Sequence, residues 1–131
     1  VTGEIAAPMV VLCLAVALWI GAFDAMYGAQ DEEFDKRHGL HSLAVSYGAA
    51  GAFRIARIAH VLSIVGFIAV GIMCRLHWPY FVGVLIAAAT LVYQHRIASP
   101  TDFSRVTQRY FMWNGIVSIA VCAFAWMSYY I

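Results

Sequence analysis

The chain has 131 residues, of which 63% are hydrophobic and only 11% are charged, and its mean hydropathy is +0.80. This composition is typical of a membrane protein rather than of a water-soluble globular domain. The net charge of +1 gives no basis for nucleic-acid binding. The three cysteines lie in or beside apolar runs without CxxC spacing, which favours packing over metal or redox chemistry.

Four apolar runs are long enough, or nearly so, to span a hydrocarbon core of ~30 Å. They cover residues 8–27, 58–73, 79–93 and 110–131. Pro8 is well placed as a first helical residue, because its fixed φ suits a helix and its missing N–H is not needed there. The sequence therefore predicts an all-α membrane protein with about four transmembrane helices.

Basic residues predict the orientation of these spans. Seven of the eight flank the predicted connections on one side: Lys36, Arg37, Arg54, Arg57, Arg96, Arg105 and Arg109. The eighth, Arg75, falls between the second and third spans. By the positive-inside rule, we expect the first and third connections to face the cytoplasm, across a bacterial inner membrane.

Five of the seven carboxylates lie within twelve residues at the end of the first span: Asp24, Asp31, Glu32, Glu33 and Asp35. We call this stretch, residues 24–35, the acidic segment. In a continuous α-helix, with about 100° per residue, Asp31 and Asp35 would lie about 20° to either side of Asp24. Glu33 would face the opposite side. The three aspartates would then share one stripe, whose mutual repulsion calls for a compensating cation.

Hard oxygen ligands in this pattern suit Mg²⁺, which is usually held by one or two carboxylates together with phosphate oxygens. Asp31 and Asp35 are the predicted ligands of one ion, and Asp24 would order its waters or bind a second ion. Lys36 and Arg37 are close enough in sequence to reach the same anion. At a membrane, a phosphorylated substrate is expected to carry a lipid tail. The alternative is a solvated helix end whose acids only balance neighbouring basic residues.

The connection after the acidic segment contains several glycines. Gly39 is a plausible stop for the first helix. A short apolar run, 43–47, then ends at Gly48 before the second span.

These residues resemble the second aspartate-rich motif of the UbiA superfamily of intramembrane aromatic prenyltransferases. The resemblance is carried by the pattern Asp24-x-x-Tyr27-x-x-Gln30-Asp31-x-Glu33-x-Asp35, followed by Gly39-Leu40-x-Ser42 and Gly48. The last span, with Tyr110-Phe-x-x-Asn114, is similar to the family's last helix. Within the family, the combination most resembles bacterial 4-hydroxybenzoate polyprenyltransferases and relatives that prenylate naphthoate-type menaquinone precursors.

The resemblance implies a nine-helix bundle with two aspartate-rich motifs, of which residues 1–131 would form the C-terminal part as one transmembrane region. It also implies Mg²⁺-dependent transfer of a polyprenyl group from its diphosphate to an aromatic acid, in ubiquinone or menaquinone biosynthesis. By resemblance, Asp31 and Asp35 are metal ligands and Asp24 is a third acid. Lys36, Arg37 and Tyr27 would contact the diphosphate. Because the first motif is absent from this sequence, we expect the chain to need the missing N-terminal half for activity.

Two other classes of protein stay open. His60 in the second predicted span and His95 at the end of the third could ligate the haem of a b-type cytochrome, if they face each other at similar depth. A membrane ion transporter or assembly subunit could also use acidic groups, with Gly66 and Gly71 allowing close helix packing. A transporter, however, would place carboxylates near the bilayer midplane.

Overall fold

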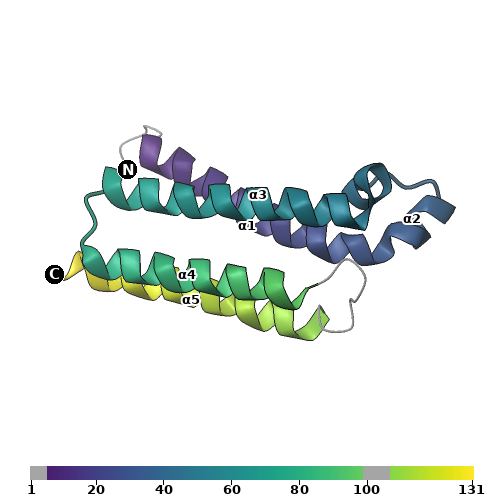
Figure 1. The fold of residues 1–131 in the computed structure, drawn as a ribbon. Helices are drawn as coiled ribbons and strands as arrows, with labels where there is room; N and C mark the ends of the chain where they lie inside the picture. Colours follow the sequence, from purple (N-terminus) through teal and green to yellow (C-terminus); the bar gives the residue numbers. More distant parts are fainter. Residues whose placement is uncertain (1–5, 99–106) are drawn as a thin grey trace.

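The structure, a computed structural model, describes residues 6–98 and 107–131. All of the regular structure in these ranges is helical (Figure 1). The elements are α1 (Ala7–Gly28), the 3-10 turn η1 (Ala29–Asp31), α2 (Glu32–Arg37), α3 (Leu43–Met73), α4 (Trp78–Ile97) and α5 (Thr107–Tyr129). Four helices are long and apolar enough to cross a membrane. The predicted all-α membrane fold is confirmed.

The helices form two antiparallel hairpins (Figure 1). α1 packs along α3, and α4 packs along α5, whereas α3 and α4 contact each other more sparsely. The helix α2 projects beyond one end of the bundle, and the start of α1 and the end of α5 lie at the opposite end (Figure 1). The acidic segment therefore lies at one extremity of the molecule.

Local sequence signals explain where the helices begin. A proline lies in the first turn of both α1 and α4, as its fixed φ favours. Ser42 caps α3, and its Oγ accepts a hydrogen bond from the Val45 N–H at 3.2 Å. The predicted start of the second span, near residue 58, is wrong, because α3 begins at Leu43 and incorporates the short apolar run. Gly48, with φ 71° and ψ 163°, kinks the helix at the predicted break.

Glycine allows close approach within each hairpin and between them. A Cβ added to Gly66 of α3 would lie 2.7 Å from the Cβ of Ala15 in α1. A Cβ on Gly83 of α4 would lie 2.7 Å from the Cβ of Phe124 in α5. In a membrane, where burial of apolar surface from water does not drive helix association, such backbone proximity supplies the packing energy.

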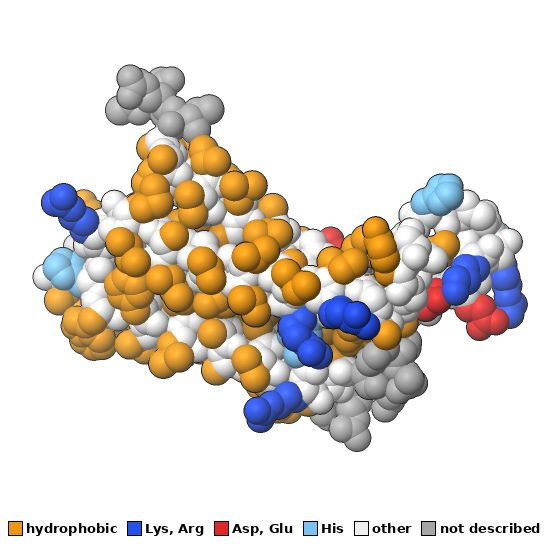
Figure 2. All heavy atoms as spheres, turned by 45° about the horizontal axis from the view of Figure 1, so that its top comes forward, with side chains coloured by type: hydrophobic (Ala, Val, Ile, Leu, Met, Phe, Trp, Pro, Cys, Tyr) orange, Lys and Arg blue, Asp and Glu red, His pale blue; other side chains and the backbone are white. Residues whose placement is uncertain are grey.

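The surface of the long helices is predominantly apolar (Figure 2). Charged side chains gather toward the end that carries α2, where acidic and basic groups lie side by side (Figure 2). Large side chains such as Leu14, Val61 and Leu85 are more than half exposed along the spans. In water such a surface would be unfavourable, whereas it matches the hydrocarbon of a bilayer.

Candidate functional site at the end of the first span

The acidic segment follows a broken helical path. α1 ends at Gly28, a 3-10 turn covers Ala29–Asp31, and α2 continues for six residues. Gly39 then adopts φ +66°, and the Leu40 N–H donates to the Asp35 carbonyl at 2.9 Å. The prediction that Gly39 stops the helix is confirmed. The prediction of a continuous α-helix through the segment is wrong.

The 3-10 turn changes the relation among the aspartates. Each residue of this turn advances about 20° further than in an α-helix, which moves Asp31 and Asp35 to about 40° and about 80° from Asp24. In residues 6–98 and 107–131, no three His, Cys, Asp or Glu side chains come close enough together to hold a metal ion. Asp31 and Asp35 remain one turn apart. Any metal site here needs oxygen ligands from outside the described residues.

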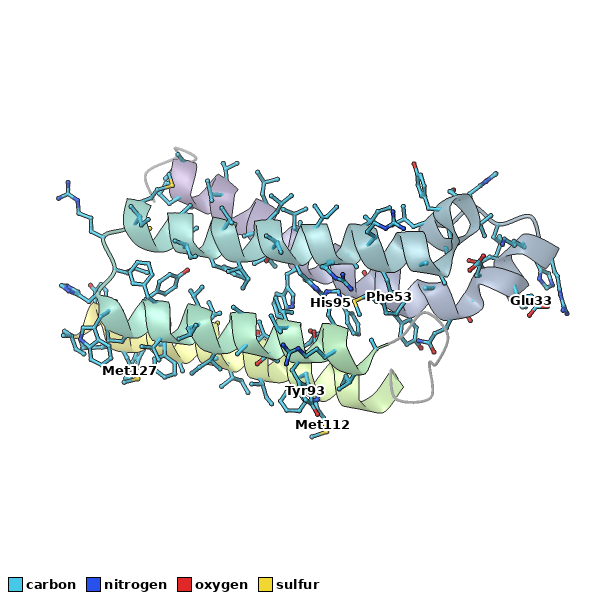
Figure 3. The ribbon with its side chains drawn as sticks, in the orientation of Figure 1. Glu33, Phe53, Tyr93, His95, Met112 and Met127 are labelled. Atoms are coloured by element: carbon cyan, nitrogen blue, oxygen red, sulfur yellow. The ribbon has the colours of Figure 1, made fainter. Side chains whose placement is uncertain are left out.

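Glu32 and Glu33 form ion pairs with the two basic residues of α2. Lys36 Nζ lies 2.5 Å from Glu32 Oε1, and Arg37 forms an ion pair with Glu33. Glu33, at the tip of the structure in Figure 3, is 81% exposed. Within the described part of the chain, no ion pair reaches the three aspartates. Their charge is therefore not compensated by the residues that the sequence places next to them.

Glu32 has a second role that the sequence analysis missed. Its Oε2 accepts a hydrogen bond from the Ala49 N–H at 2.8 Å. The kink at Gly48 restarts the helix, and the N–H groups of a first helical turn have no acceptor within the helix. Glu32 supplies that acceptor and ties α2 to α3. The signal in the sequence was Gly48, directly after the short apolar run, because a helix that resumes after a glycine kink needs an acceptor for its first N–H groups.

Two further motif residues lie beside the aspartates. The Tyr27 ring stacks on Phe23, with centroids 6.4 Å apart, and remains 39% exposed. Gln30 carries a buried side-chain amide nitrogen with no hydrogen-bond acceptor in the described residues. An amide donor without a partner, one residue from Asp31, is suited to an oxygen of an anionic ligand.

The sequence matches the UbiA prenyltransferase family over residues 1–115. The chain belongs to this family. It is 28% identical over 122 residues to a 4-hydroxybenzoate octaprenyltransferase of Nitrosospira multiformis, covering 93% of this chain and 41% of that protein. It is 31% identical over 96 residues to the 4-hydroxybenzoate octaprenyltransferase of Alcanivorax borkumensis, covering 73% of this chain and 33% of that protein. The chain thus spans less than half of these relatives. No solved structure matches it.

The cytochrome alternative does not fit the geometry of this UbiA family chain. His60 Nδ1 lies 2.8 Å from His95 Nε2, and His60 Nε2 lies 3.3 Å from the Trp19 carbonyl oxygen. A haem iron with two axial histidines would have to lie between two ring nitrogens, and these rings contact each other directly. The pair instead joins the two hairpins, with His95 between α3 and α4 (Figure 3).

The structure also gives no support to the transporter alternative, because no acidic side chain of the described residues is buried. The buried polar side chains of the described residues are His60, Ser63, Thr90, Gln94 and Ser128. None of them is a carboxylate, and the aspartates of the acidic segment are exposed or half-buried at one end. An ion path through the bilayer would be expected to place acids in the interior.

Proposed function

We propose that this chain forms part of an enzyme that transfers a polyprenyl group from polyprenyl diphosphate to an aromatic acid, in the synthesis of a respiratory quinone. The acceptor would be 4-hydroxybenzoate, for ubiquinone, or a related naphthoate, for menaquinone. Family membership and the names of the relatives support the reaction class. The observation that carries the proposal is the pair Asp31 and Asp35 at the end of a membrane helix, which no described cation compensates.

The donor set fits Mg²⁺, because two carboxylates that lie one turn apart, with no cationic partner among the described residues, are suitable ligands when phosphate oxygens and water complete the shell. Asp31 and Asp35 would hold one ion, with Asp24 nearby for its waters or for a second ion. When bound, Mg²⁺ would neutralise the diphosphate and make it a better leaving group.

The remaining residues would bind and position the donor. Gln30, whose buried amide nitrogen has no acceptor among the described residues, can donate an N–H to a diphosphate oxygen. Lys36 and Arg37 can leave their glutamates at little cost, because exposed ion pairs are worth only about 0–1 kcal/mol. Tyr27, which stays partly exposed, can reach the same anion with its hydroxyl.

The apolar helices would hold the isoprenoid tail and exclude water from the reacting carbon. During transfer, the bond between the allylic carbon and the diphosphate oxygen breaks, and an electron-rich ring carbon forms the new carbon–carbon bond and then loses its proton. Water would compete with the ring for the cation-like allylic carbon. A site at the bilayer boundary can bind the charged diphosphate at the surface and keep the tail and the reacting carbon away from water. The acidic segment is proposed to lie on the cytoplasmic side of the inner membrane.

One acidic segment is proposed to form only half of the site. A diphosphate that bridges two ions needs carboxylates on both flanks, and the described aspartates do not enclose an ion by themselves. We therefore expect residues 1–131 alone to be inactive. Co-expression with a segment that carries the family's other aspartate motif should restore Mg²⁺-dependent transfer. Turnover by the isolated chain would contradict this proposal.

The decisive test compares three alanine variants in the complete enzyme. Asp31→Ala and Asp35→Ala should each lower Mg²⁺-dependent turnover by about 100- to 1,000-fold, comparable to the loss of a key electrostatic group. Glu33→Ala is the matched control, because Glu33 is exposed and pairs only with Arg37 among the described residues. The assay follows a radiolabelled prenyl group into 4-hydroxybenzoate over a Mg²⁺ titration. Equal losses at all three positions would overturn the assignment.

A further inference from the structure

A groove of about 480 Å³ lies between α3 and α4, on the line where the two hairpins meet. Apolar side chains form its walls, including Val61 and Val65 from α3 and Ala88 and Val92 from α4. The three valines are more than half exposed. The groove therefore presents apolar surface at the outside of the described bundle.

Two arginines lie at one end of this groove, Arg57 from α3 and Arg96 from α4. Both are exposed, and neither forms an ion pair within the described residues. The lining that the structure describes contains no carboxylate. Its charge is thus entirely positive and is confined to one end.

Both arginines lie at a similar depth in the bundle. Arg57 precedes the end of α3 at Met73 by sixteen residues, which is about 24 Å, and Arg96 follows the start of α4 at Trp78 by eighteen, which is about 27 Å. The hydrocarbon core is ~30 Å thick, so a helix end at one boundary places both arginines near the other. The groove runs from there toward the bilayer interior, over about 12 Å between Arg57 and Val65.

We propose that this groove binds an anionic glycerophospholipid. The phosphodiester would lie between Arg57 and Arg96, and the first part of an acyl chain would lie along the valines. Among the described lining residues there is no carboxylate, which argues for a phospholipid over a Mg²⁺–diphosphate complex, because such a complex brings its own cations and needs acidic ligands. This proposal is independent of the proposed reaction.

The test measures lipid retention on the purified, delipidated protein by native mass spectrometry. Phosphatidylglycerol and phosphatidylcholine with identical acyl chains are titrated separately. Phosphatidylglycerol should bind more tightly, and Arg57→Gln and Arg96→Gln should each weaken it about fivefold without affecting phosphatidylcholine. Arg75→Gln is the control, because Arg75 lies in the loop between α3 and α4, at the other end of both helices.

A second variant tests the walls without changing charge. Ala88→Trp should fill the groove and weaken both lipids. Equal affinities for the two lipids, or an equal loss in Arg75→Gln, would overturn the proposal. A competition experiment gives a further contrary outcome. If geranylgeranyl diphosphate with Mg²⁺ displaced bound phosphatidylglycerol at a lower concentration than free phosphatidylglycerol does, the groove would belong to the prenyl donor and the proposal would be overturned.

Discussion

The α1–α3 hairpin and the α4–α5 hairpin use the same packing device but differ in what they carry. Each brings its backbones together at a glycine, Gly66 in one and Gly83 in the other. The end of the first hairpin that carries α2 holds the acidic segment, the kink at Gly48 and the hydrogen bond from Ala49 to Glu32. The described residues of the second hairpin contain no acid at all. Both hairpins thus pack in the same way, whereas the residues of the proposed chemistry lie at one end of the first hairpin.

The junction between the hairpins is sparse and partly polar. The His60–His95 contact lies at one level, and the Tyr80 hydroxyl donates to the Phe67 carbonyl at 2.9 Å at another. A Cβ on Gly71 of α3 would lie 2.6 Å from the Tyr80 ring of α4, so this ring packs directly against the backbone of α3. These polar contacts accompany an apolar cluster shared by the two hairpins, which includes Phe67 of α3 and Val84 of α4. Mutation of single polar contacts can therefore measure what they add to this apolar packing.

The largest effect on stability is expected from overpacking the second hairpin. Gly83→Leu should destabilise the protein by about 3 kcal/mol, because the new side chain meets Phe124 and the backbone carbonyl of Ala120. Gly115→Leu in α5 is the control, since a Cβ there has nothing within 4 Å. Unfolding by sodium dodecyl sulfate in mixed micelles gives both values. If both substitutions lowered the free energy of unfolding equally, the effect at Gly83 would come from helix propensity and not from close packing.

A smaller loss is expected at the kink of the first hairpin. Gly48→Ala should cost about 2 kcal/mol, because φ 71° with ψ 163° is a conformation that essentially only glycine adopts. Space is not the obstacle, since a Cβ on Gly48 has nothing within 4 Å. The variant should also speed amide hydrogen exchange at Ala49, whose bond to Glu32 depends on the kink. Gly21→Ala, in unstrained helix, should leave that exchange unchanged.

The smallest effect is expected at the junction. Tyr80→Phe removes one buried hydrogen bond and should cost about 1 kcal/mol. Tyr93→Phe is the control, because the described residues include no hydrogen bond from that exposed hydroxyl. Measured in the same micelles, the difference between the two variants reports the contribution of the junction. No difference would mean that the hairpins associate without the Tyr80 bond.

Much of the fold could be predicted because its signals are local. Apolar length identified the four spans, proline marked the start of α1, and Gly39 marked the end of α2. The early start of α3 was missed because Gly48 was interpreted as a boundary, whereas the helix resumes directly after one non-helical residue. A helix can resume after a glycine when the N–H groups that follow the glycine find an acceptor outside the helix. Here that acceptor is Glu32, on another helix.

The candidate site was predictable in composition but not in arrangement. The aspartates were found from charge density, yet their alignment assumed an unbroken helix and failed at the 3-10 turn. The pairing of Glu32 with Lys36 was visible as an i,i+4 spacing, which favours such ion pairs. This ion pair was given too little weight in the sequence analysis, because Lys36 and Arg37 were assigned to the diphosphate and their pairing with acids was kept only as the alternative. The metal ligands stay a prediction.

The hydrogen bond between Glu32 and Ala49 has a consequence for the order in which the protein assembles. It joins residues 17 positions apart, whereas the His60–His95 contact joins residues 35 apart. A short loop loses less chain entropy on closure than a long one, so α1 and α3 should associate before α4 is docked. During synthesis the first hairpin could then be complete while the second is still inside the ribosome. In a variant whose own cysteines are replaced, a cysteine in place of Ala22, which is buried in a cluster formed mainly by α1 and α3, reports this pairing. It should already be protected from a membrane-permeant maleimide in nascent chains that end soon after Met73 has emerged, and full reactivity there would place the pairing after docking.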